Sequence, residues 1–149
     1  MFSQSAIKKS LPGVCRGFTL IEILVTISII ALLTMIGVTN FRVANQKARD
    51  GRRQGDLEQI KAALELYRTD QGIYPKTGQW SGAGGSLSFG GTTYMETIPD
   101  DPITSRNYPY TSAAGATYTL CAALELSTGS VSGCGSCGVT CNYKVTSPL

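Results

Sequence analysis

The first long feature of the chain is an apolar run close to the N-terminus. Residues 18–38 read FTLIEILVTISIIALLTMIGV, and Glu22 is the one charged side chain among them. A run of this length favours a helix over a strand. About 20 apolar residues in a helix span the hydrocarbon core of a bilayer. The pattern therefore predicts a transmembrane helix over residues 18–38.

A second helical pattern follows the apolar run. Leu57, Ile60, Leu64 and Tyr67 recur at helical spacing, with charged residues on the opposite face. Gly72, soon followed by a proline, is typical of a helix end. We therefore expect one helix over residues 18–71, in which the amphipathic part, 39–71, packs on a domain.

Beyond the helix, residues 72–149 carry the signals of loops and short strands. Residues 76–91 are rich in glycine and serine, which predicts a surface loop. Strands are expected within 108–111, 117–124 and 142–145. The fold class predicted is α+β, with a long N-terminal helix packed against a small C-terminal antiparallel β-sheet.

Alternation within the longest of these strands assigns its faces. Tyr118, Leu120, Ala122 and Leu124 alternate onto one face, toward the helix stripe, and Cys121 points to the other. Trp80, in the loop, is either an exposed contact residue or a cap on the edge of the core, and the cap is favoured.

Composition argues against an enzyme. The 149 residues contain no histidine, which excludes Ser-His-Asp and Cys-His catalysis and histidine-based zinc sites. After Glu96 the acids are only Asp100, Asp101 and Glu125, too few to propose an acid/base pair. We therefore expect neither catalysis nor a cofactor.

Charge gives the expected orientation of the chain. Lys8, Lys9 and Arg16 precede the apolar run with no acid among them, and they account for the net charge of +3. By the positive-inside bias, this cluster predicts a cytoplasmic N-terminus. The apolar run is longer than that of an ordinary secretory signal, and no small-residue cleavage site follows it.

The junction between the basic leader and the apolar run is distinctive. The segment GFTLIEILVTISIIALL, which begins at Gly17, resembles the class III signal of type IV pilins and type II secretion pseudopilins. The resemblance implies that a prepilin peptidase removes residues 1–17 by cutting after Gly17, and methylates the new terminus at Phe18. An acid within the membrane is a functional hypothesis in itself. We expect Glu22 to pair with the Phe18 amine of an adjacent subunit; the alternative is a carboxylate at the membrane interface.

The function implied by the resemblance is structural. The chain would be a prepilin, assembled through its apolar helix into a type IV pilus-like helical surface filament. The alternative is the major pseudopilin of a type II secretion system, and a second alternative is a DNA-uptake or adhesive pilin, the one case involving nucleic acid. The implied partners are other copies of the chain, the prepilin peptidase, an inner-membrane assembly platform and a cytoplasmic assembly ATPase. The subunit would cross the cytoplasmic membrane once before assembly and afterwards lie in a cell-surface or periplasmic filament.

One further segment and one departure from the family refine the resemblance. A turn pattern that leaves the helix is similar to that of the major pseudopilin and Gram-positive or candidate-phylum pilin branch, and its residues here are Tyr67, Asp70, Gly72, Tyr74 and Pro75. The acidic calcium-binding loop of the secretion pseudopilins has no counterpart here, so no metal is predicted.

A basic cluster lies within the helix. It is a patch for nucleic acid or acidic neighbours, or else a solvated or inter-subunit helix face. The second interpretation is favoured because no aromatic residues interleave the cluster. Its members are Arg42, Lys47, Arg49, Arg52 and Arg53.

Four cysteines follow the helix: Cys121, Cys134, Cys137 and Cys141. An even number in a domain outside the membrane favours disulfides. A four-cysteine zinc site and a Cys-x-x-Cys redox centre are the alternatives. The expected pairing is Cys121–Cys141 with Cys134–Cys137, because Cys121 and Cys141 adjoin two strands expected to be neighbours.

Overall fold

The computed structural model describes residues 17–148. The expected leader, apart from Gly17, lies outside the described residues. The chain divides into two compact units, with the boundary between Asn40 and Phe41. The elements are α1 (Leu20–Gln71), η1 (Thr77–Gln79), β1 (Leu87–Phe89), β2 (Thr92–Met95), β3 (Tyr110–Thr111), β4 (Thr119–Ala122) and β5 (Tyr143–Thr146).

In the first unit, α1 exposes its apolar side chains. It is long and apolar enough at this end to cross a membrane, and the apolar window is not buried by any part of the protein that the structure describes. The hydroxyl groups of Thr26, Ser28 and Thr34 are satisfied within the helix: Thr26 Oγ1 donates to the Ile23 carbonyl at 2.8 Å, Ser28 Oγ to that of Val25 at 2.7 Å, and Thr34 Oγ1 to that of Ile30 at 2.9 Å. These three side chains can therefore enter an apolar environment with their hydroxyl groups already paired.

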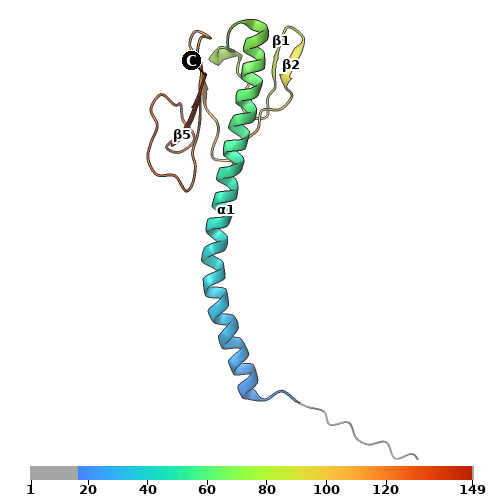
Figure 1. The fold of residues 1–149 in the computed structure, drawn as a ribbon, viewed down its shortest axis with the longest axis vertical. Coiled ribbons are helices and arrows are strands. Elements are labelled where there is room, and N and C mark those ends of the chain that lie inside the picture. Colours follow the sequence, from blue (N-terminus) through green and yellow to red (C-terminus); the bar gives the residue numbers. More distant parts are fainter. Residues whose placement is uncertain (1–16, 149) are drawn as a thin grey trace, which may run out of the picture. The chain divides into compact units, whose positions relative to one another are not determined.

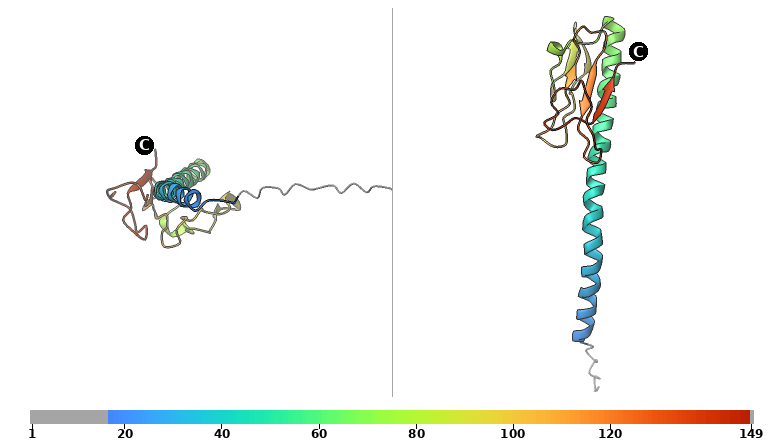
Figure 2. Two further views of the ribbon diagram at one scale, coloured as in Figure 1. Left: turned by 90° about the horizontal axis from the view of Figure 1, so that it is seen from below. Right: turned by 90° about the vertical axis from the view of Figure 1, so that its left-hand side faces the viewer.

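In the second unit, the remainder of α1 lies beside two small antiparallel sheets (Figures 1 and 2). Strands β1 and β2 form a hairpin, and β3, β4 and β5 form a three-stranded sheet with β4 in the centre. The architecture is α+β and pilin-like, so the predicted fold class is confirmed.

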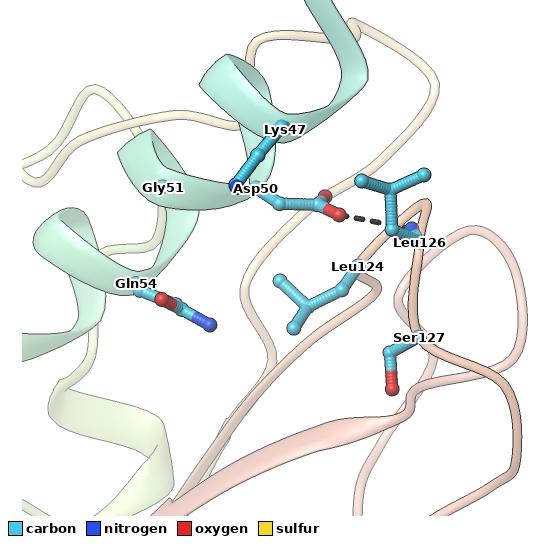
Figure 3. Close-up of a pocket in the computed structure, with 7 residues that line it drawn as sticks. All are labelled: Lys47, Asp50, Gly51, Gln54, Leu124, Leu126 and Ser127. Atoms are coloured by element: carbon cyan, nitrogen blue, oxygen red, sulfur yellow. Dashed lines mark hydrogen bonds between the residues drawn. The ribbon is translucent and has the colours of Figure 1, made fainter. Parts of the chain in front are cut away.

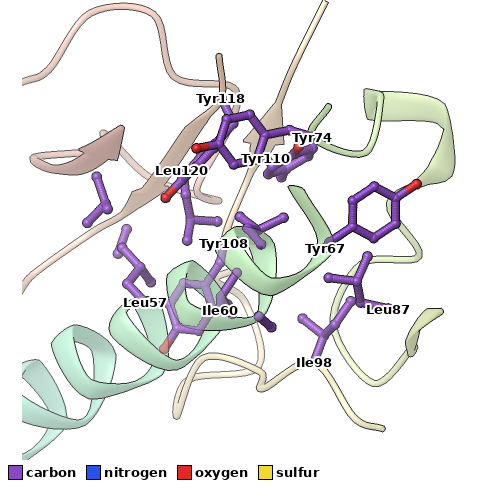
Figure 4. Packing of buried hydrophobic residues seen from close by; sticks show 14 residues of the cluster. Leu57, Ile60, Tyr67, Tyr74, Leu87, Ile98, Tyr108, Tyr110, Tyr118 and Leu120 are labelled. Carbon is purple, nitrogen blue, oxygen red and sulfur yellow. The ribbon is translucent and has the colours of Figure 1, made fainter. Parts of the chain in front are cut away.

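The helix stripe and the central sheet share one hydrophobic core (Figure 4). Leu57, Ile60 and Leu64 have no exposed area and pack with Tyr118 and Leu120 of the sheet region. Cys121 faces a second, smaller cluster, while Tyr118, Leu120 and Ala122 belong to the main core, so the predicted alternation is confirmed for these four residues. It is wrong for Leu124, which lies beyond the end of β4, is half-buried and does not belong to the core cluster.

Aromatic rings extend this core. Tyr74 meets Tyr118 edge-on at 4.7 Å between centroids. Trp80 stacks on Tyr110 at 4.7 Å and is half-buried against the core. The interpretation of Trp80 as a cap on the core edge is therefore confirmed.

The helix ends at a glycine in the left-handed region. Gly72 has φ 74°, and its N–H donates to the carbonyl of Arg68 at 2.7 Å. Tyr74 then turns back into the core, where its hydroxyl bonds the Glu65 carboxylate at 2.9 Å. The turn thus links the end of α1 to the domain core.

The loop prediction for residues 76–91 is wrong in part. Leu87–Phe89 pairs with Thr92–Met95 through a Gly90-Gly91 turn in which both glycines have positive φ. Such a turn matches the twist of a two-residue hairpin. The three predicted strands are present but shorter than expected, or displaced by a residue at the C-terminal end.

Candidate functional site

The residues expected to direct processing and assembly lie at the start of the described chain. Gly17 and Phe18 precede α1, the Phe18 side chain is 79% exposed, and the Gly17 Cα has open space around it. Glu22 lies in the first turn of α1, where the helix dipole favours an acid. Its backbone N–H donates to Thr19 Oγ1 at 3.3 Å. Cleavage after Gly17, methylation at Phe18 and pairing by Glu22 stay predictions.

A buried ionic network is the most elaborate polar feature of the second unit. Arg53 has no exposed area, and its guanidinium donates to three carboxylates. The bond from Nε to Asp101 Oδ2 measures 2.7 Å and that from Nη2 to Asp101 Oδ1 2.9 Å. Nη1 donates to Asp50 Oδ1 at 2.8 Å and to Glu125 Oε1 at 2.9 Å.

Arg49 completes the network one turn earlier on α1. It forms a forked pair with Glu125, with distances of 2.7 and 2.6 Å. These bonds from Arg49, followed by those from Arg53, lower the pKa of Glu125 to about 2. The bonds to Asp101, and next those to Glu125, raise the pKa of Arg53. Both groups are therefore charged at neutral pH, and they join α1 to two separate loops.

Asp50, which is already part of the network, and Asp56, a further buried acid on α1, bind other segments of the domain. Asp50 accepts the backbone N–H groups of Glu125 and Leu126, at 2.8 and 2.9 Å. Asp56 accepts the hydroxyl of Tyr108 at 2.9 Å. Burial, together with this bond, raises the pKa of Tyr108. Side chains on three successive turns of α1 thus determine the course of the loops that pass it.

This network corrects the interpretation of the basic cluster. Arg53 is not on a solvated face, and Arg49 is largely occupied by Glu125. Arg53 lies four residues before Leu57, so it continues the buried stripe, and that spacing was the available signal. Arg42, Lys47 and Arg52 are exposed, as the solvated-face interpretation expected. With two of its five cations paired in this way, the cluster does not favour a nucleic-acid interface.

The disulfide pairing predicted from the sequence is wrong. The bonds are Cys121–Cys134 and Cys137–Cys141, with Cα–Cα distances of 6.0 and 5.6 Å. The register of β4 and β5 explains the error, because Cys121 lies opposite Lys144 and Ala122 opposite Tyr143. Cys141 consequently falls beyond the paired segment and not beside Cys121. Bonded sulfurs cannot act as thiolate ligands, so the zinc alternative is wrong, and within residues 17–148 no other acidic or cysteine group is placed to hold a metal ion.

A shallow, open pocket lies where α1 meets the segment after β4 (Figure 3). Leu124 and Leu126 form its apolar side, and the opposite side is helix. The lining residues are Lys47, Asp50, Gly51, Gln54, Leu124, Leu126 and Ser127. A Cβ at Gly51 would meet no atom within 4 Å, so the helix side of the pocket is open.

Comparison with known proteins points to one family. Residues 14–38 match the model of the prokaryotic N-terminal methylation motif. The chain is 34% identical over 94 residues to the type II secretion system core protein G of Dickeya chrysanthemi, covering 63% of this chain and 54% of that protein. It is 30% identical over 94 residues to the protein of that name from Aeromonas hydrophila, covering 58% and 66%. With the Escherichia coli K12 protein it shares 39% identity over 64 residues, covering 43% and 44%.

The chain spans about half the length of the curated relatives that it matches. No solved structure matches it significantly. The methylation motif at the start of an apolar helix, the α+β fold and the relatives agree with one another. On these grounds, the chain is a member of the type IV pilin and pseudopilin family.

Proposed function

We propose that the chain is a pseudopilin of a type II secretion system, equivalent to the core subunit of its filament. The observation that carries this proposal is the match over 94 residues to proteins named type II secretion system core protein G. The sequence alone made a surface pilus the first expectation and a secretion pseudopilin the alternative. The relatives support the alternative.

Processing is the first step of the proposed function. The prepilin peptidase cuts after Gly17 and methylates the amine of Phe18. Both residues precede α1 in the structure, in backbone that no helix protects. An extended, accessible backbone is what a peptidase needs, so the arrangement fits cleavage at this point.

The exposed apolar side chains of α1 supply the force for assembly. Before assembly the helix is stable in the membrane, and in a filament it would be buried among the same helices of other copies. Because its hydroxyls are already satisfied, burial leaves no unpaired side-chain hydroxyl at Thr26 or Ser28. The large exposed residues include Ile21, Leu24, Ile27, Ile30 and Leu33.

The Phe18 amine and the Glu22 carboxylate then fix the stagger between copies. Each charge is unfavourable when buried alone, and pairing the amine of one subunit with the carboxylate of the next relieves both penalties. Only an arrangement with the correct axial offset can make this pair. The pair therefore selects one register among many that would bury similar apolar area.

The proposal includes a location and partners. The subunit is anchored in the cytoplasmic membrane by a single span and later forms a periplasmic filament. The prepilin peptidase, a membrane assembly platform and an assembly ATPase act on it. The role is structural, and no catalytic step is proposed.

Deleting the gene in its host tests the assignment. We expect exoenzymes to accumulate inside the cells while surface pili persist, and expect the wild-type gene to restore secretion. The variant Gly17→Lys, which blocks cleavage, should not restore it at equal expression. Normal secretion accompanied by loss of surface pili would instead favour the surface-pilus function.

A further inference from the structure

The pocket beside Gly51 has no occupant within its own copy, although its apolar side is well exposed. Leu126 is 47% exposed at its rim. Figure 3 shows Leu124 and Leu126 on the loop side, facing the helical turns that carry Gly51 and Gln54. The missing side chain at Gly51 leaves room for an apolar group to approach the helix backbone.

A matching apolar side chain occurs elsewhere on the surface of the same chain. In the described part of α1 that follows Val43, Leu66 is the one large apolar side chain that stays mostly exposed, at 60%. It does not belong to the core stripe and makes no contribution to either core cluster. Leu66 and the pocket are separate surfaces of one molecule.

The charges around the two surfaces are complementary. Lys47, at the pocket, is exposed and has no carboxylate within salt-bridge distance in residues 17–148. Glu58 and Asp70 flank Leu66 along the helix, and both are exposed. Glu58 has only a loose pair with Lys61 at 3.5 Å. The carboxylate of Asp50 also lines the pocket, but it is bonded to Arg53 and to two backbone N–H groups, so Lys47 is the charge at the pocket that is free to meet a partner's acid.

We propose that Leu66 of one copy inserts into the Gly51 pocket of a neighbouring copy, a contact that rests on the proposed filament function. Because all copies enter from the same membrane, their helices are parallel. Placing Leu66 opposite Gly51 then offsets the two helices by 15 residues, or about 22 Å at 1.5 Å per residue. This neighbour is a different copy from the one whose Phe18 amine pairs with Glu22, because that pair offsets two helices by only four residues, or about 6 Å.

The same register brings the polar groups together. Lys47 comes level with Ala62 of the neighbour, one turn from Glu58. Because helical side chains lean toward the N-terminus, the Lys47 ammonium reaches toward that carboxylate. Asp70 comes level with Gly55 and leans toward the amide of Gln54. One register therefore satisfies the apolar group and both acids.

The geometry of this contact also favours a fibre. It joins two different surfaces, so each copy keeps one free pocket and one free Leu66 for further partners. A head-to-tail contact of this type generates an open polymer unless its rotation closes a ring.

Paired cysteine substitutions in the full chain test the register. In host cells that assemble filaments, the double variant Gly51→Cys/Leu66→Cys should give, on mild oxidation, a ladder of covalent dimers, trimers and larger species. Each single variant should give no ladder. The matched control is Gly51→Cys/Gln59→Cys, because Gln59 is exposed on nearly the same face as Leu66 but about 10 Å lower along the helix.

The four cysteines of the domain are bonded within each copy and do not compete. A ladder from the Gly51/Leu66 pair and none from the control supports the contact. Filaments without that ladder, or a ladder from the control alone, would overturn the contact while leaving the proposed function intact. Failure of the unsubstituted chain to form filaments would overturn the proposed function, and this contact with it.

Discussion

Arg53 and Asp101 form a forked ion pair in which neither side chain has any exposed area. Asp101 lies 48 residues after Arg53, so the pair joins α1 to the loop between β2 and β3. Asp101 Oδ1 also accepts the N–H of Ile103 at 2.8 Å, which holds the loop in place. Burying an ion pair carries a large desolvation penalty, so its main effect is to specify where this loop lies.

Replacing Arg53 by methionine should destabilise the domain strongly. The change leaves three carboxylates near a buried apolar group, and breaking such a pair costs about 3–5 kcal/mol. Chemical denaturation of the detergent-solubilised full chain measures the change in the free energy of unfolding. Arg52→Met is the control, because Arg52 is 63% exposed on its side chain and 3.9 Å from Asp56, and should change stability by less than about 1 kcal/mol. Equal effects of the two substitutions would contradict the conclusion that the buried ion pairs of Arg53 stabilise the domain.

Glu125 should make the domain sensitive to acid. Its pKa in the folded protein, about 2, lies below the ordinary value of about 4.3. The unfolded chain therefore takes up the proton first, and the free energy of unfolding falls as the pH drops from about 4.3 toward 2. Above that range the contribution is fully present. Denaturation midpoints measured between pH 7 and pH 2 follow this loss of stability.

The variant Glu125→Gln isolates that effect. It should be less stable than the wild type at pH 7, and the difference between the two proteins should shrink as the pH approaches 2. A difference that stays constant with pH would show that Glu125 is not held as a carboxylate by Arg49 and Arg53.

The disulfide pairing predicts a specific peptide map. Digestion without reduction should release one fragment joined through Cys121 and Cys134, and a separate one joined through Cys137 and Cys141. Changing Cys121 and Cys134 together to serine should cost about 3 kcal/mol in the chain-entropy model, and changing the other pair should cost less, because its loop is shorter. A fragment joining Cys121 to Cys141 would contradict the structure.

Glu22→Ala should block assembly without blocking membrane insertion. The substitution makes the helix more apolar, so insertion is unimpaired, but it leaves the Phe18 amine without a partner in the filament. Processed, membrane-bound subunit should accumulate, with few or no filaments. Filament yield after shearing, at equal expression, is the measurement. A normal filament yield would contradict the pairing of Glu22 with the Phe18 amine and leave the family assignment unchanged.

The sequence was sufficient for features that depend on local periodicity. The stripe from Leu57 to Tyr67, the end of the helix at Gly72 and the alternation around Cys121 all follow from spacing alone, and the structure agrees. The Gly90-Gly91 hairpin was also a local signal, but the glycine- and serine-rich residues before it obscured the pattern.

Features that depend on distant partners could not be predicted in the same way. From the sequence alone, Arg53 is predicted to be a surface residue. It is buried because the fold places Asp101 and Glu125, which are distant in the chain, within hydrogen-bonding distance of its guanidinium. The cysteine pairing depended on the register of β4 and β5, which places Cys141 beyond the strand pair. Each error therefore concerned which segments meet, and not which residues form helix or strand.

Each disulfide joins one cysteine to the next cysteine along the chain: Cys121 to Cys134, and Cys137 to Cys141. The loop closed by one disulfide therefore contains no cysteine of the other. In the proposed orientation the domain crosses the cytoplasmic membrane from its N-terminal side, so Cys121 and Cys134 reach the oxidising compartment before Cys137 and Cys141. Pairing thiols in order of arrival then yields the native bonds directly, with nothing to reshuffle. A nested pattern would have required Cys121 to stay reduced until the last cysteine had been translocated.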